Sequence, residues 1–129
     1  MKKKILIVVA DYYNDISSGL IKSTKKTIPN NYMMKLVRDP GVFEIPVTIS
    51  KNIKKFDAFI ALGCVIKGQT PHFDFISKTT TDGIMQISIS SKKPVGNGII
   101  TCLNMKQAIF RMNKGKEAVK AVLSILTQQ

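Results

Sequence analysis

Residues 61–75 read ALGCVIKGQTPHFDF, and this stretch decides the fold because a strand, a turn and a helix start follow one another within it. The apolar run that ends at Cys64 predicts a strand covered on both faces. Gly68 and Thr70 suit a turn, and Pro71 suits the first turn of a helix. This order is typical of an anion site, because free N–H groups and the helix dipole point at the turn.

His72 follows this turn directly and is the only histidine of the chain. An imidazole takes up and releases a proton near neutral pH, which makes His72 a candidate for proton transfer. A purely structural histidine is the alternative, and many glycine turns bind nothing. The surrounding sequence therefore has to decide between the two interpretations.

Length and composition predict one compact domain over residues 1–129. Hydrophobic residues make up 44% of the chain, yet no apolar run approaches the roughly 20 residues of a membrane span. The N-terminal lysines precede a strand-like run without a signal-peptide cleavage site, so we expect a cytoplasmic protein. Cys64 and Cys102 are too few for a disulfide framework or a four-ligand zinc site, and we expect buried thiols.

The net charge of +12 raises the hypothesis of nucleic-acid binding. The basic residues are 18 scattered lysines and only two arginines, Arg38 and Arg111. Nucleic-acid binders concentrate their charge and use arginine to contact bases and phosphates, and no aromatic-rich stacking strand is visible here. We interpret the charge as a solvated surface, and the nucleic-acid hypothesis depends on charge alone.

Strands and helices are predicted to alternate along the chain. Strands are expected over 3–10, 32–38, 56–64 and 94–101, the last interrupted at Gly96-Asn97-Gly98. Helices are expected over 15–27 with Asn14 or Asp15 as cap, from the segment 42–46 to about 54, and over 72–90, 104–112 and 116–127. The alternation predicts an α/β, flavodoxin-like three-layer sandwich, with a four-stranded parallel sheet in the order 2-1-3-4 and helices on both faces.

Chemically versatile side chains follow each predicted strand at its carboxyl end, where open parallel sheets bind ligands. They are Tyr12, Phe43, Glu44, Gln69, Thr70, His72 and, after the last strand, Arg111 and Lys114. Tyr12 and Phe43 could instead border the core, and Glu44 could be a helix-start charge. Arg111 could be a surface residue, but an arginine in a lysine-rich chain favours a role for planar, bidentate geometry.

Five sequence blocks resemble those of the lumazine synthase family (6,7-dimethyl-8-ribityllumazine synthase) of riboflavin biosynthesis. They are PGVFEIP at 40–46, the stretch 61–75, PVGNG at 94–98, QAIFR at 107–111 and NKGKEA at 113–118. The resemblance covers nearly the whole chain in order. It implies a transferase that condenses 5-amino-6-(D-ribitylamino)uracil with 3,4-dihydroxy-2-butanone 4-phosphate and releases phosphate and water, with no metal or organic cofactor.

The resemblance also implies roles for individual residues. Tyr12 takes the place of an aromatic that stacks on the pyrimidine ring, which backbone groups of Val65 and Ile66 and the side chain of Asn97 also meet. Val42, Phe43 and Glu44 are expected to hold the ribityl chain. Gln69, Thr70 and Arg111 are expected to hold the phosphate, His72 to transfer protons, and Lys114 to stand where the family keeps a lysine.

The family forms homo-oligomers, so the resemblance implies a pentamer or an assembly of pentamers. A site shared between subunits fits the expected sheet order, in which Arg111 and Lys114 lie beyond the fourth strand. Departures from the family pattern are Asp11 and Lys67 at common arginine positions, Asn97 at a common aromatic position, and a short segment from Arg111 to Asn113. A non-catalytic lumazine- or flavin-binding protein is the competing class, and His72 and Arg111 speak against it.

Overall fold

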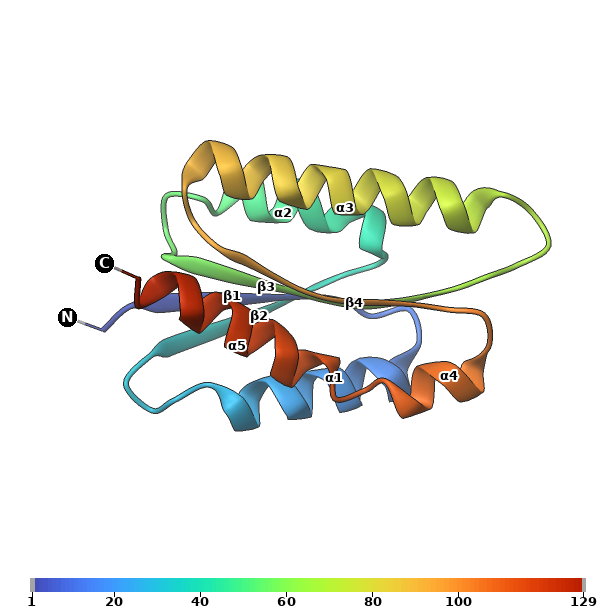
Figure 1. The fold of residues 1–129 in the computed structure, drawn as a ribbon, viewed down its shortest axis with the longest axis horizontal. Helices are drawn as coiled ribbons and strands as arrows, with labels where there is room; N and C mark the ends of the chain where they lie inside the picture. The colour runs from blue at the N-terminus through green and yellow to red at the C-terminus, as the bar shows by residue number, and fades with distance from the viewer. Residues whose placement is uncertain (1, 129) are drawn as a thin grey trace.

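The structure, a computed structural model, describes residues 2–128, which form a parallel sheet between two layers of helices (Figure 1). The strands are β1 (Lys4–Ala10), β2 (Met33–Asp39), β3 (Ala58–Ile66) and β4 (Val95–Cys102), in the order β2-β1-β3-β4. The helices are α1 (Asn14–Thr27), α2 (Ile45–Lys51), α3 (His72–Ser91), α4 (Met105–Phe110) and α5 (Lys114–Leu126), with the 3-10 turn η1 (Val42–Glu44) before α2. The predicted sheet order and fold class are confirmed. The predicted domain range also includes Met1 and Gln129, which lie outside the described residues.

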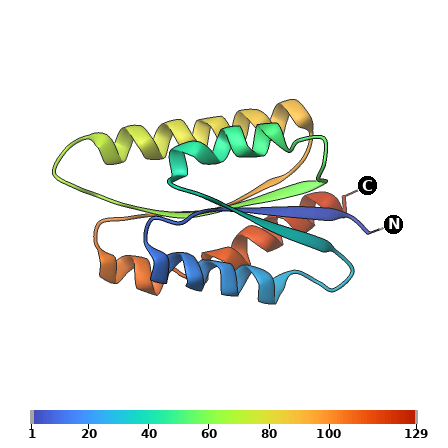
Figure 2. The ribbon, with the colours of Figure 1, turned by 180° about the vertical axis from the view of Figure 1, so that it is seen from behind.

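The sheet separates two hydrophobic cores, because alternate side chains of each strand point to opposite faces. Ile7, Ile60 and their strand neighbours of the same parity pack under α1, α4 and α5. Val8 and Ala61, which face each other in register, belong to the other core under α2 and α3. Figure 2 shows these two helical layers from behind. Both central strands are therefore apolar on both faces, as the unbroken hydrophobic runs predicted.

The predicted interruption of the last strand is wrong, since β4 runs continuously through Gly96, Asn97 and Gly98. A Cβ at Gly96 would collide with the Ala118 carbonyl on α5, and one at Gly98 would lie 2.9 Å from the Ala61 carbonyl. The two glycines thus allow α5 and β3 to approach β4 closely. Glycine marks tight packing here instead of a break.

Several helix boundaries also differ from expectation. The first helix begins at Asn14 with Tyr13 as its cap residue and no capping side-chain bond, so the predicted Asn14 or Asp15 cap is wrong. The second helix ends earlier than expected, at Lys51. Helix α3 continues through Gly83, where the absence of a side chain lets Pro46 of α2 pack closely against α3. Asn104 does cap α4, because its side chain accepts the Gln107 N–H at 2.9 Å. In the described part of the chain, no helix is both long and apolar enough to cross a membrane.

Candidate functional site

The carboxyl ends of the strands and the loops that follow them lie at one end of the molecule, away from both termini (Figure 1). These loops carry most of the predicted site residues. Tyr12, Phe43 and His72 are all exposed there. The end of the sheet therefore presents an open set of side chains instead of a closed cavity.

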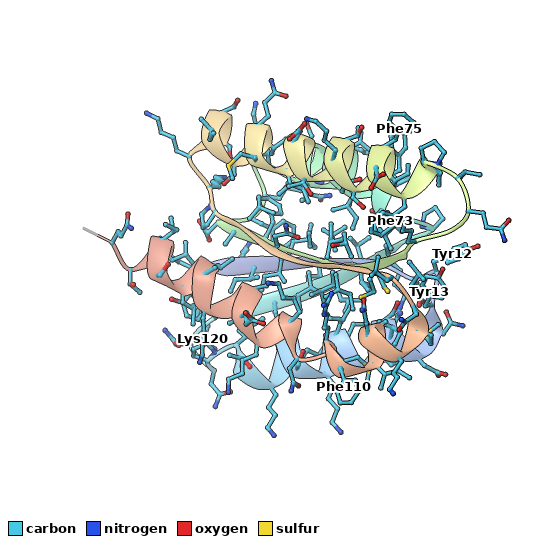
Figure 3. All side chains as sticks on the ribbon, turned by 45° about the vertical axis from the view of Figure 1, so that its right-hand side comes forward. Tyr12, Tyr13, Phe73, Phe75, Phe110 and Lys120 are labelled. Carbon is cyan, nitrogen blue, oxygen red and sulfur yellow. The ribbon has the colours of Figure 1, made fainter. Side chains whose placement is uncertain are left out.

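Tyr12 projects from the β1–α1 loop with 72% of its surface exposed. Its ring meets the edge of the Tyr13 ring at a centroid distance of 4.9 Å (Figure 3). Tyr13 packs against the core, and burial, with smaller effects of Tyr12 and Cys64, raises the pKa of its hydroxyl. The buried Ser17 holds the base of this loop by donating its hydroxyl to the Ala10 carbonyl at 3.1 Å. An exposed ring on an anchored loop is suited to stacking against a planar ligand.

Arg38 and Asp11 form an ion pair that the sequence analysis missed. A guanidinium nitrogen of Arg38 lies 2.8 Å from the Asp11 carboxylate, one residue before Tyr12. The Asp11 N–H also donates to the Asp39 carbonyl at 2.9 Å, which extends the pairing of β1 with β2. The sequence did hold a signal, because Arg38 is one of only two arginines in a lysine-rich chain.

The η1 turn carries the predicted ribityl-binding residues. Val42 is buried in the core, Phe43 is 57% exposed, and Glu44 is half-buried beside Gly41. Phe43 and Glu44 border a cleft of about 400 Å³, which is otherwise lined by Pro46, Val47, Thr79, Thr80 and Gly83. The Glu44 carboxylate is thus placed at the edge of an apolar depression between α2 and α3.

The β3–α3 turn carries the remaining residues of this group. Val65 and Ile66 end β3 half-buried, and the Lys67 N–H continues the pairing by donating to the Cys102 carbonyl at 2.8 Å. Gln69, Thr70 and His72 are exposed, and the Thr70 hydroxyl accepts the His72 N–H at 3.4 Å.

Gly68, in the same turn, has no positive φ, and a Cβ built there would meet no atom within 4 Å. The chain itself does not require glycine at this position. The open backbone therefore leaves room for a ligand to approach the turn.

Arg111 and Lys114 lie apart from these residues, beyond the edge strand β4. Arg111 donates to the Thr101 carbonyl at 3.0 Å, and Lys114 lies 3.8 Å from the Glu117 carboxylate. A second depression of about 400 Å³ is lined by Ile99, Ile100, Thr101, Phe110, Arg111, Asn113, Lys114 and Glu117. It shares no residue with the cleft at Phe43 and Glu44.

The two groups also lie on different sides of the sheet. Figure 3 shows Phe73 on the side of α3 and Phe110, the neighbour of Arg111, on the opposite side. Asn97 lines neither depression; it sits opposite Ala61 in mid-strand, exposed, and its side-chain oxygen accepts the Ile99 N–H at 3.0 Å. One chain therefore brings together Tyr12, Phe43, Glu44, Thr70 and His72 at one end, but not Arg111, Lys114 or Asn97.

Potential metal-ligating side chains are scattered over the described residues. Within residues 2–128, no three His, Cys, Asp or Glu side chains gather as a metal site would require. Cys64 and Cys102 are free and buried, as expected from the sequence. The predicted site residues at the carboxyl end include aromatic rings, the Thr70 hydroxyl, the Glu44 carboxylate and the His72 imidazole.

The fold and the gathered side chains define a class, the doubly wound α/β proteins that carry reactive groups at the carboxyl ends of their strands. The sequence model of the 6,7-dimethyl-8-ribityllumazine synthases matches residues 2–129. The chain belongs to this family, and its activity is that of a 6,7-dimethyl-8-ribityllumazine synthase, a transferase of riboflavin biosynthesis.

Curated bacterial relatives with that name are similar to nearly the whole chain. The protein of Cutibacterium acnes is 34% identical over 133 residues, which cover 96% of this chain and 80% of the relative. The Paenarthrobacter aurescens protein is 37% identical, with 94% and 81% covered. The Campylobacter curvus protein is 36% identical, with 97% and 87% covered.

Proposed function

We propose that this chain joins 5-amino-6-(D-ribitylamino)uracil to 3,4-dihydroxy-2-butanone 4-phosphate at the carboxyl end of the sheet. The pyrimidine ring stacks on Tyr12 and meets the backbone of Val65 and Ile66. The ribityl chain lies along Val42 and Phe43, and its hydroxyls donate to the Glu44 carboxylate. This placement is supported by the exposure of Tyr12 and Phe43 and by the position of Glu44 at the rim of the cleft.

The phosphate of the second substrate lies at the turn before α3. Gln69 and the Thr70 hydroxyl donate to it, and the open space at Gly68 lets its oxygens approach the backbone. The start of the 20-residue helix α3 adds a favourable dipole for an anion. A guanidinium group, with several donors in one plane, completes the grip on the phosphate.

His72 moves the protons that the condensation requires. The primary amine attacks the ketone carbon, and loss of water leaves an imine. Phosphate then leaves with the electrons of its C–O bond while a proton is removed from the adjacent carbon. This elimination leaves an enol, which takes up a proton on carbon and becomes a carbonyl group. The ribitylamino nitrogen then closes the ring onto this carbonyl, and a second water is lost. Each step transfers a proton to or from nitrogen, oxygen or carbon, and an imidazole at the phosphate turn serves this purpose. Holding two reactive substrates together supplies the rest of the acceleration.

The observation that carries the proposal is the division of the site. Tyr12, Phe43, Glu44 and His72 belong to one end of the sheet, whereas Arg111 and Lys114 line a separate depression beyond β4. A neighbouring subunit that presents its Arg111, Lys114 and Asn97 to the first group would complete the site. A head-to-tail contact of this kind closes into a ring, and we propose a pentamer or an assembly of pentamers.

Mixed rings test this arrangement. Inactive His72→Ala and Arg111→Ala chains are unfolded together and refolded. If neighbours share sites, some sites take His72 from one chain and Arg111 from the next, so activity reappears. Each variant refolded alone is the control and should stay inactive. Mixed rings that co-purify through two different tags but remain inactive would refute the shared site.

The cytoplasmic location also stays a prediction.

A further inference from the structure

The amino end of the sheet, opposite the proposed active site, carries a cluster of exposed lysines, which we call the lysine face. The connections that lead into the strands gather at this end (Figure 1). The exposed lysines of these segments stand at 2–4, 25–26, 51, 54–55 and 92. They are distant in the sequence, but each crossover helix returns the chain to this end before the next strand begins.

The chain compensates little of this positive charge. Of its eight acidic residues, only Asp57 belongs to these segments, and its carboxylate accepts the Lys4 backbone N–H at 2.8 Å. The ion pairs found within residues 2–128 use no lysine of the lysine face. Acidic residues stand mainly at the other end of the strands, namely Asp11, Asp15, Asp39, Glu44 and Asp74.

Helix dipoles explain only part of this arrangement. A cation near the C-terminus of a helix is stabilising, which accounts for the lysines at 25–26 and 51 in the last turns of α1 and α2. The lysines at 2–4 and 54–55 lie outside the helices, so the dipole does not call for them.

A structural role distinguishes Lys93 from the lysine face. Lys93 is partly buried, and its ammonium group donates to the carbonyls of Phe56, at 2.9 Å, and Ile53. Among the described residues, the only ammonium group of the lysine face with such a bond is that of Lys2, which lies 3.4 Å from the Asn30 carbonyl. The other ammonium groups are therefore available to a ligand.

The residue types of the lysine face indicate which ligand it suits. Lysine contacts phosphates as a point charge, and arginine, the usual reader of base edges, does not occur in these segments. Single strands stack their bases on aromatic rings, and proteins that lie on membranes insert aromatic or leucine side chains. Within residues 2–128, the large exposed side chains of these types lie outside the face; they are Tyr12, Phe43, Phe75, Leu103 and Phe110.

A nucleic-acid duplex matches the charge without needing aromatic residues. Four strands at about 4.8 Å spacing make the face roughly 15–20 Å wide. A duplex carries one phosphate charge for about every 1.7 Å of its axis, so on the order of ten phosphates span this width.

We infer that the lysine face binds the phosphate backbone of duplex nucleic acid without reading its sequence. The lysines look scattered in the sequence, which argued against such a ligand, but the fold gathers them. The lack of arginine and of exposed aromatic rings limits the contact to the backbone. Because the face and the proposed active site lie at opposite ends of the strands, the synthase reaction proceeds with the duplex bound.

A labelled DNA duplex of about 20 base pairs tests the inference by fluorescence anisotropy. We expect a Kd of about 1–100 μM at 0.1 M salt and a steep loss of affinity as the salt concentration rises. The Lys26→Gln/Lys54→Gln variant should bind at least about tenfold more weakly. Its slope of log K against log salt should also fall by about two, since each lost phosphate contact removes about 0.9.

The matched control is Lys22→Gln/Lys120→Gln, which removes the same charge from exposed positions within α1 and α5 (Lys120 is labelled in Figure 3). It should keep the wild-type affinity and slope. Both variants should keep the wild-type synthase activity, because none of these lysines belongs to the proposed active site.

Acetylation of lysines in the wild-type protein, followed by mass spectrometry, locates the bound duplex without any substitution. The duplex should slow acetylation of Lys54 and Lys55 by about threefold or more and leave Lys22 and Lys120 unchanged. An RNA duplex of the same length should bind within about tenfold of the DNA, because both present a phosphate backbone.

No binding at millimolar duplex, equal loss in both variants, or unchanged acetylation of Lys54 and Lys55 would overturn the inference. So would a preference of more than about tenfold for one sequence, for a single strand, or for RNA over DNA, since the backbone would then not be what is recognised. Lysine-dependent binding to vesicles with about 30% phosphatidylserine, without binding to the duplex, would also overturn it and assign the face to a membrane.

Discussion

Arg38 and Asp11 lie 2.8 Å apart across the ends of β2 and β1, and this ion pair fixes the residue that precedes Tyr12. The Asp11 N–H is held as well, by the Asp39 carbonyl. Tyr12 itself has little contact beyond the Tyr13 ring. The orientation of Tyr12 therefore depends on its neighbours in the loop.

Breaking this pair should affect the pyrimidine substrate selectively. We expect Arg38→Ala to raise the KM for the ribitylaminouracil about three- to tenfold, with a smaller change for the phosphorylated substrate. Lys78→Ala breaks an exposed pair of the same length with Asp82 and should change neither constant. The double variant Asp11→Arg/Arg38→Asp should restore part of the loss. Equal effects on both substrates would show that Arg38 does not act through the orientation of Tyr12.

Replacing His72 should lower turnover without unfolding the chain. The side chain is exposed, and only its backbone N–H makes a hydrogen bond, to Thr70. We expect His72→Ala to lower kcat by roughly ten- to a thousandfold because the proton-transfer group is lost. Circular dichroism should show an unchanged fold. Turnover at the wild-type rate would refute the proton-transfer role.

Arg111→Lys should weaken the phosphorylated substrate far more than the pyrimidine. Lysine keeps the charge but loses the planar set of donors that matches a phosphate. Arg38 is the only other arginine of the chain, so Arg38→Lys is a matched control. This substitution should leave the KM of the phosphorylated substrate nearly unchanged. Steady-state kinetics with each substrate varied in turn measures both. A similar loss for both substrates in Arg111→Lys would indicate a structural role.

Two glycines should respond to alanine in opposite ways. A Cβ at Gly115 would collide with Thr24, Ser23 and the Leu20 carbonyl on α1, so Gly115→Ala should lower the free energy of unfolding by about 1–3 kcal/mol. A Cβ at Gly68 meets open space, so Gly68→Ala should keep full stability but lose about tenfold in kcat/KM for the phosphorylated substrate. Urea unfolding and kinetics separate the two. Full activity in Gly68→Ala would place the phosphate elsewhere.

The buried thiol of Cys64 predicts a loss of stability in alkaline solution. Burial, with smaller effects of Cys102, raises the pKa of this thiol to about 12. The unfolded chain ionises its thiol near pH 8.5–9, whereas the folded thiol stays neutral there. From about pH 9 upward, ionisation therefore stabilises the unfolded chain relative to the folded one. Between pH 7.5 and pH 10, wild type should lose about 1–2 kcal/mol more than Cys64→Ala, which retains every lysine. Parallel losses in both proteins would contradict the raised pKa.

The sheet could be predicted from the sequence because its central strands are long apolar runs separated by turn residues. Boundaries and breaks were less predictable where packing decides them. Gly96 and Gly98 read as a strand interruption, yet they serve close contacts with residues distant in the sequence. The β1–α1 junction carries two good capping residues, but the helix begins after Tyr13 without a side-chain bond.

The candidate site follows the same division. Residues directly after a strand, such as Tyr12 and His72, could be placed from the alternation of elements alone. The ion pair of Asp11 with Arg38 could not, because it depends on the register of β1 against β2. The separation of Arg111 from His72 followed from the sheet order. The hydrogen bond from Arg111 to the Thr101 carbonyl could not be predicted, because it depends on the position of the side chain.

The solitary, exposed imidazole of His72 also makes this protein its own spectroscopic label. Each chain contributes a single histidine Hε1 proton, in a region of the NMR spectrum that no other histidine of the chain crowds. In an assembly whose subunits are all equivalent, that proton gives one line. If half the sites hold ligand, or if subunits in a larger shell differ in surroundings, the line divides into as many components as there are environments. Occupancy and symmetry can thus be read from one resonance without adding a probe.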